Sequence, residues 1–377
     1  MKHNILRMTA VLLAAVLLFA VLPGCGSKEV TDDSTAVVFE GEKIGKDEVS
    51  LYVYMTQYVT EMNNEEVVSY LFANYETFWK TESGGETYAE HAREDAVKKL
   101  IQTRILNLKA KGDGTVLDDE EEAKVQNAIE SFRDDFASVV EKSGASDELI
   151  EKFVRENAIA NKVYASVTGA ASVDEGAEEF RRKTFEGVML YEKYYEEGDE
   201  DYFEYTEEEL EASREKNLEL ISERLKNGEA VEDIVSDYAE HQILSVSSVQ
   251  ASVVDPEDAA EEGEEFTSYR NLAWSLSTGE VGTVITKNSA GHNVGYIIRS
   301  VNDDDPDERA SAVLSALEEA KETAFEKVYA RLTKKYDEIT VREEILSELA
   351  IGDPLFESDL MISEEELEAL EEAEEDE

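Results

Sequence analysis

Histidine and cysteine are the side chains that most often carry metal or nucleophilic chemistry, and this sequence contains four histidines and one cysteine. His91, His241 and His292 stand far apart, and neither an H-E-x-x-H nor a G-x-S-x-G motif is present. We interpret them as a mid-helix, a helix-end and a loop residue. The single Cys25 excludes an intramolecular disulfide and any multi-cysteine metal site. We therefore expect no metal and no cofactor.

The amino terminus has the pattern of an export signal. Lys2 and Arg7 come before an apolar run over residues 8–22, which is short for a membrane span. The following Leu-Pro-Gly-Cys, ending at Cys25, resembles a bacterial lipobox. This resemblance implies a signal peptide over 1–24, lipidation of Cys25, a tether over 25–36 and an anchor on the outer face of the cytoplasmic membrane. The alternative is a simple signal peptide followed by an incidental cysteine.

The composition limits the partners of the chain. Its 377 residues include 89 Asp and Glu against 36 Lys and Arg, which gives a net charge of −53. Such a surface repels nucleic acids and favours solubility and cationic partners. Apolar residues make up 42% of the chain, enough to build cores, so we expect two or three folded domains and not a disordered chain.

Apolar residues recur at helical spacing through the first half of the mature chain. A short strand over 37–39 is followed by a helix from Asp47 to about residue 62. Further amphipathic helices are predicted over 86–111, over 118–142 and from Ser146 onward. These elements indicate a helical bundle, to which a helix over 307–336 and a strand over 338–341 are added near the end of the chain.

The middle of the chain has a different pattern. We predict strands over 187–195 and 243–254 and a hairpin over 281–301, interleaved with helices over 207–226 and 267–276. Residues 279–301 contain one acid, Glu280, because a buried unpaired carboxylate costs several kcal/mol. The overall fold class is therefore α+β, with a small antiparallel sheet flanked by helices.

The order of these motifs resembles a parvulin-type peptidyl-prolyl isomerase domain. The matching segments are residues 225–239 (LKNGEAVEDIVSDYA), 273–276 (AWSL), 279–281 (GEV) and 295–298 (GYII). The flanking segments FEGEKIGKDEVSLYVY and LIQTRILNLKAK resemble the chaperone region of PrsA-type and SurA-type foldases. The resemblance implies a chaperone domain over 37–184 and 303–350, a parvulin-like domain inserted over 185–302, and an acidic tail over 351–377.

The sequence departs from this family where the chemistry would be. Active parvulins carry one histidine on the first strand and another in G-Y-H-I-I, but here Ile297 stands at the second position and the first strand has none. The residues left as pocket candidates are Met189, Tyr191, Trp274, Tyr296 and Ile297. Plain core packing is the alternative for each. Isomerase activity is implied by the resemblance, and the missing histidines indicate that it is weak or lost.

The resemblance implies a lipid-anchored extracytoplasmic foldase or chaperone that binds unfolded, newly exported proteins. Tyr52, Met55, Tyr58 and Met62 on the helix over 47–62 are candidate client contacts, with core packing as the alternative. An active isomerase with an altered pocket and a non-catalytic adaptor lipoprotein are the other functions that we consider. The run Asp303-Asp304-Asp305 lacks the glycine of a calcium loop, and we interpret it as a solvated linker.

Overall fold

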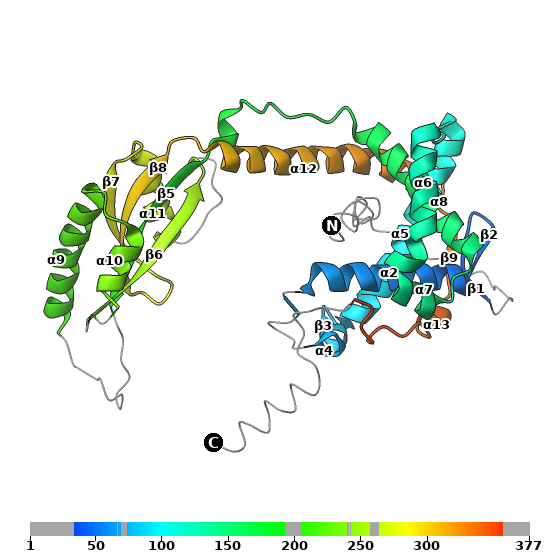
Figure 1. Ribbon diagram of the computed structural model, residues 1–377, viewed down its shortest axis with the longest axis horizontal. Helices are drawn as coiled ribbons and strands as arrows, with labels where there is room; N and C mark the ends of the chain where they lie inside the picture. Colours follow the sequence, from blue (N-terminus) through cyan, green and yellow to red (C-terminus); the bar gives the residue numbers. More distant parts are fainter. Residues whose placement is uncertain are drawn as a thin grey trace, which may run out of the picture. The chain divides into compact units, whose positions relative to one another are not determined.

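A computed structural model describes residues 34–65, 67–68, 74–192, 206–239, 241, 243–256 and 264–356 (Figure 1). The signal peptide over 1–24, the lipidation candidate Cys25 and nearly all of the tether lie outside the described residues. The chain divides into a first unit, Met1–Ala171 with Lys321–Glu377, and a second unit, Ser172–Ala320. The α+β fold class is confirmed. The assignment of a chaperone domain to residues 37–184 and 303–350, and of a parvulin-like domain to residues 185–302, stays a prediction.

A small sheet joins the two segments of the first unit. Strand β1 (Thr35–Phe39) pairs antiparallel with β2 (Glu42–Gly45) and with β9 (Ile339–Val341), in the order β2-β1-β9. Val38 lies opposite Thr340. Because β1 and β9 come from opposite ends of the described chain, their pairing ties the carboxyl-terminal segment to the amino-terminal one. The strands expected over 37–39 and 338–341 are thus both present.

Helices make up most of the rest of the first unit and surround a large apolar core, beside which lies a smaller apolar cluster around Trp79. The long helices are α2 (Lys46–Asn63), α5 (Tyr88–Asp113), α6 (Asp119–Asp135) and α8 (Asp147–Thr168). The shorter elements are α4 (Tyr75–Lys80), β3 (Glu82–Ser83), β4 (Glu86–Thr87), α7 (Ala137–Ser143) and α13 (Glu343–Leu346).

One predicted helix is in fact two. The spacing over 118–142 predicts a single helix, but the structure breaks it at Phe136, whose backbone has φ −128° and ψ 43°. The ring of Phe136 packs 5.3 Å from that of Tyr58 and 4.9 Å from that of Phe132, measured between centroids. The break lets Phe136 and α7 pack against α2, so burial of the aromatic ring outweighs helix continuity.

The first six residues of the predicted acidic tail are anchored to the core by three apolar side chains. Leu355 is buried, and Ile351 and Phe356 pack against the apolar core of the first unit. The backbone N–H groups of Leu355 and Phe356 donate to Oε2 of Glu61, at 2.7 and 2.9 Å. We call residues 351–356 the C-terminal strap. The tail beyond it, residues 357–377, lies outside the described residues.

The second unit is built on a four-stranded antiparallel sheet. Its strands are β5 (Lys183–Glu192), β6 (Leu244–Val253), β7 (Val281–Lys287) and β8 (Asn293–Asn302), in the order β6-β5-β8-β7. Helices α9 (Glu207–Lys226) and α10 (Val231–Asp237) pack on one face, and α11 (Glu264–Ser275) packs on the other (Figure 1). The nearly neutral segment over 279–301 forms β7 and β8, and burial of β8 explains its lack of acids.

Two further elements complete the description. The short 3₁₀ helix η1 (Glu178–Phe180) comes before β5, and α12 (Pro306–Thr333) follows β8. The amino-terminal part of α12 belongs to the second unit and its carboxyl-terminal part to the first. Every helix among the described residues is too short or too polar to cross a lipid bilayer.

Candidate functional site

The five predicted pocket residues do not share one surface of the sheet. In the register of β5 and β8, Met189 lies opposite Tyr296 and Val188 lies opposite Ile297. Neighbouring side chains of a strand point to opposite faces. Met189, Tyr191 and Tyr296 therefore lie on the face that α11 covers, together with Trp274 of α11 itself. Ile297 lies on the other face, under α9 and α10.

The face around Ile297 is a packed core. Ile297, Val188 and Leu190 of the sheet and Ile221 and Ile234 of the two helices are all 0% exposed. These side chains form one apolar cluster. A site that twists an amide bond needs polar groups and room for the substrate. The side chains that cluster with Ile297 are hydrocarbon except for Tyr238, whose hydroxyl already donates to Asn217 Oδ1 at 2.6 Å. We therefore interpret this face as a packed core and not as a substrate pocket.

Trp274 is held by cationic side chains and is not an open pocket wall. Lys183 Nζ donates to the carbonyl oxygens of Trp274 and Leu276, at 2.8 Å each. The Lys183 ammonium and the Arg181 guanidinium lie 5.5 and 5.2 Å from the centroid of the indole ring, within the range of cation–π contacts. These contacts fasten the carboxyl-terminal end of α11 to the start of β5.

The acidic run that follows β8 is not a solvated linker, which corrects the prediction. Asp303 pairs with Lys183 at 3.2 Å, and the hydrogen bond from Lys183 lowers the pKa of the Asp303 carboxyl. Asp304 pairs with Arg309 at 2.9 Å. Asp305 Oδ1 accepts from the backbone N–H of Asp307 at 3.1 Å and so caps α12. Each of the three aspartates has a structural role.

The described histidines have local structural contacts and do not form a catalytic pair. His91 Nε2 lies 3.0 Å from the carbonyl oxygen of Ser83. His241 Nδ1 accepts from the backbone N–H groups of Ile243 and Leu244, at 3.2 and 3.0 Å. His292 lies in the β7–β8 turn, where its backbone N–H donates to Asn288. Among the described residues no cluster of three or more His, Cys, Asp or Glu could hold a metal ion.

The predicted client contacts on α2 are core residues, which corrects that prediction. Tyr52, Met55 and Tyr58 are at most 8% exposed, and Met62 is partly buried against the same core. The Tyr52 hydroxyl accepts from Asn157 Nδ2 at 3.2 Å, and burial raises the pKa of Tyr52 to about 12. A client cannot reach Tyr52, Met55 and Tyr58 while the first unit is folded, and Met62 is only partly exposed.

The surface of the first unit has instead an apolar groove between α6 and α8, which run side by side (Figure 1). The groove has a volume of about 190 Å³. Its polar rim consists of Glu121, Lys124, Asn157, Asn161 and Lys162. Its apolar lining consists of Leu117, Val125, Ala128, Phe132, Phe136, Phe153, Val154 and Ala158. We call the whole site, lining and rim together, the α6–α8 groove.

The sequence builds the two walls of the groove by helical periodicity. On α6, Val125, Ala128 and Phe132 recur at steps of three and four residues, and on α8 Val154 and Ala158 are four residues apart. Asp118 and Glu121 form a capping box that starts α6. No single residue type marks the groove in the sequence, because it forms only when the two helices meet.

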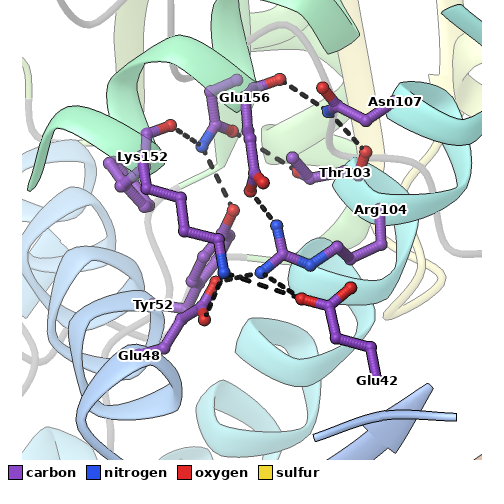
Figure 2. Close-up of polar contacts among 10 residues, drawn as sticks. Glu42, Glu48, Tyr52, Thr103, Arg104, Asn107, Lys152 and Glu156 are labelled. Atoms are coloured by element: carbon purple, nitrogen blue, oxygen red, sulfur yellow. Dashed lines mark hydrogen bonds and ion pairs between the residues drawn. The ribbon is translucent and has the colours of Figure 1, made fainter. Parts of the chain in front are cut away.

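A buried polar cluster fixes the α8 wall against α2 and α5 (Figure 2). Arg104 of α5 is 4% exposed and pairs with Glu48 of α2 and Glu156 of α8. Lys152 of α8 adds a 3.0 Å contact to Glu48. Figure 2 shows these side chains converging from the three helices. The buried charges are therefore paired, as the cost of desolvation requires.

Amide hydrogen bonds continue this support up to the groove itself. Asn157, which lies on the rim, donates to the hydroxyl of Tyr52 on α2 and, at 2.8 Å, to the carbonyl oxygen of Phe153. Asn107 Nδ2 of α5 donates to the carbonyl oxygen of Glu156 at 2.9 Å. Rim and floor are thus positioned by the core and not by surface loops.

Comparisons with known proteins give one kind of match. No protein-family model and no curated protein matches the chain. Among solved structures, the chain is similar to one described with PEB4 and Cj1289, two SurA-like chaperones of Campylobacter jejuni. The identity is 12%, the match covers 82% of this chain and 100% of that one, and the TM-score is 0.27.

Two foldase structures are also similar to this chain. For foldase protein PrsA from Lactococcus lactis the identity is 12%, the coverage 84% of this chain and 99% of that one, and the TM-score 0.28. For PrsA from Streptococcus pneumoniae the values are 13%, 75% and 99%, with a TM-score of 0.26. These structures are of the SurA-like and PrsA type that the sequence motifs resemble.

Proposed function

We propose that this protein is a lipid-anchored extracytoplasmic foldase or chaperone that binds unfolded, newly exported proteins. The observation that carries the proposal is the α6–α8 groove, an apolar surface site on a folded helical unit. Val116, next to the groove residue Leu117, is 72% exposed and extends the apolar surface. Exposed apolar patches on a soluble protein mark interaction sites, and a groove of this kind suits exposed apolar side chains of an unfolded chain.

The second unit supports a role without isomerase chemistry. Its helices and strands follow one another in the order predicted from the sequence, and Ile297, which stands where parvulins carry a histidine, is part of the core. In this proposal the second unit is an isomerase-like domain with lost chemistry. The predicted lipid on Cys25 keeps the protein on the outer face of the cell membrane, near the chains that emerge there.

Suppression of aggregation tests the proposal. The purified mature protein is mixed with a denatured secreted protein of near-zero net charge, and light scattering is followed as the client is diluted from denaturant. We expect scattering to fall as the protein is raised to equimolar amounts. If scattering is unchanged, the chaperone function is wrong. Incorporation of labelled palmitate by the wild type but not by Cys25→Ser tests the anchor.

A further inference from the structure

The α6–α8 groove has a volume that limits what it can hold. Its 190 Å³ is close to the roughly 150 Å³ of an engineered protein cavity that binds benzene. One phenylalanine, leucine or methionine side chain fits such a volume, whereas a folded element does not. Phe132, Phe136 and Phe153 give the groove an aromatic lining that favours an aromatic or aliphatic anchor.

The two helices that form the groove carry a net negative charge, although the rim itself has one glutamate, Glu121, and two lysines, Lys124 and Lys162. Helix α6 contains seven acids and two bases, a net charge of −5, and α8 contains four acids and three bases, a net charge of −1. The two lysines on the rim are already paired, Lys124 with Glu120 at 2.7 Å and Lys162 with Glu121. The first turn of α6, residues 119–122, is wholly acidic. A cationic neighbour of the anchor would therefore be attracted.

From this geometry we infer that the groove binds a single large apolar side chain of a client segment that is flanked by lysine or arginine. This inference rests on the proposed function and names its client class. An acidic occupant is disfavoured, because it would face the net negative charge of both helices. The acidic residues 357–377 of this chain are such an occupant, and the experiment includes them as a competitor.

Peptide binding by the full mature chain tests the inference. The probe is a fluorescein-labelled peptide with one phenylalanine and lysines on both sides, read by fluorescence anisotropy at low salt. Matched peptides replace the lysines with glutamates or the phenylalanine with alanine. We expect the glutamate peptide to bind about tenfold more weakly and the alanine peptide about tenfold to a hundredfold more weakly. The lysine preference should shrink at high salt.

Blocking variants place the peptide in the groove. Ala158→Trp fills it from α8 and Ala128→Trp fills it from α6, since both alanines are half-buried in its lining. The matched controls Ala165→Trp and Ala123→Trp are at exposed positions on the same helices. We expect each blocking variant to weaken binding about tenfold or more and each control to leave it unchanged. Circular dichroism checks that each variant is folded. If one blocking variant does not fold, the variant on the other helix provides the test.

Three outcomes overturn the inference. These are equal binding of the lysine and glutamate peptides, full binding by folded Ala158→Trp and Ala128→Trp, and displacement of the lysine peptide by a peptide of residues 357–377. None of them affects the aggregation test, because its client has no net charge and is not assigned to a particular surface. If the peptides bind as expected but the protein does not slow aggregation, the assignment of the groove stands and the chaperone function is rejected.

Discussion

Glu61 is a buried carboxylate whose hydrogen-bond partners are all neutral. It is 0% exposed, and Oε1 accepts from Gln57 Nε2 at 2.8 Å and Trp79 Nε1 at 2.9 Å. Oε2 accepts the two backbone N–H groups of the C-terminal strap. These four donors hold three parts of the first unit together: α2, α4 and the strap.

Replacing Glu61 with glutamine should destabilise the first unit. The amide nitrogen of Glu61→Gln would face N–H donors and leave buried groups unpaired, which costs about 1–3 kcal/mol for each group. We expect a total loss of about 2–4 kcal/mol in the free energy of unfolding at pH 7, measured by urea denaturation. Glu65→Gln is the control, because Glu65 lies beyond the end of α2 and is only half-buried. A loss below about 0.5 kcal/mol would contradict the role of Glu61.

The pH dependence of this loss follows from the direction of the pKa shift. Burial raises the pKa of Glu61 from its usual 4.5, against the opposing effect of its four hydrogen-bond donors. The folded protein therefore holds this proton more tightly than the unfolded chain, so its contribution is complete below pH 4.5 and is lost as pH rises through the raised pKa. The stability difference between wild type and Glu61→Gln should widen as pH falls toward 4.5. If it narrows, the hydrogen bonds to the carboxylate outweigh its burial.

Helix α8 depends on buried ion pairs for its place against α2 and α5. Removing the guanidinium in Arg104→Met would leave the buried Glu48 with Lys152 alone and the partly buried Glu156 without its cation. Breaking a buried pair from one side costs about 3–5 kcal/mol. We expect a loss of that size in the free energy of unfolding, measured by urea denaturation.

The control for this change is Lys111→Met, which removes a charge from an exposed position on the same helix. We expect it to change the free energy of unfolding by less than about 0.5 kcal/mol. An equal effect of the two substitutions would mean that loss of positive charge from a protein of net charge −53 explains the result, and not the loss of a buried pair.

Much of the element order could be predicted from the sequence, because helical and strand periodicities are local. The hairpin of β7 and β8 and the capping box of α9 are examples. The break between α6 and α7 at Phe136 could not be predicted from the sequence, because it depends on packing of Phe136 against Tyr58 of α2. The separation of Tyr296 from Ile297 could have been predicted, since adjacent residues of a strand face opposite ways.

The candidate site was less predictable than the elements. The spacing of Tyr52, Met55, Tyr58 and Met62 on α2 is the same whether these side chains face solvent or the core. In the structure they pack against the core. Glu61 has no signal of its own, because acids on helices are usually exposed. The α6–α8 groove forms from two helices whose contact is tertiary, so neither sequence segment reveals it alone.

At the scale of the whole molecule, the high negative charge and the buried apolar clusters have separate roles. Among the described residues the acids are almost all at least partly exposed, and a net charge of −53 for the chain favours solubility. The buried carboxylates of Glu48 and Glu61 are compensated, the first by cations and the second by four hydrogen-bond donors. This division is what a protein needs if it offers an apolar groove without aggregating itself.

The proposed lack of isomerase activity can be tested on the intact mature protein. Prolyl isomerisation must lower a barrier of about 18–20 kcal/mol. The second unit has packed hydrocarbon around Ile297, the position at which parvulins, which its motifs resemble, carry a histidine. We therefore expect no acceleration above background in a protease-coupled proline-peptide assay, in which an active prolyl isomerase serves as the positive control. Trp274→Ala should leave the rate unchanged, because the α11 face holds Trp274 by contacts with Lys183 and Arg181. Acceleration by the wild type that Trp274→Ala abolishes would establish a working pocket on that face and reject a purely binding role.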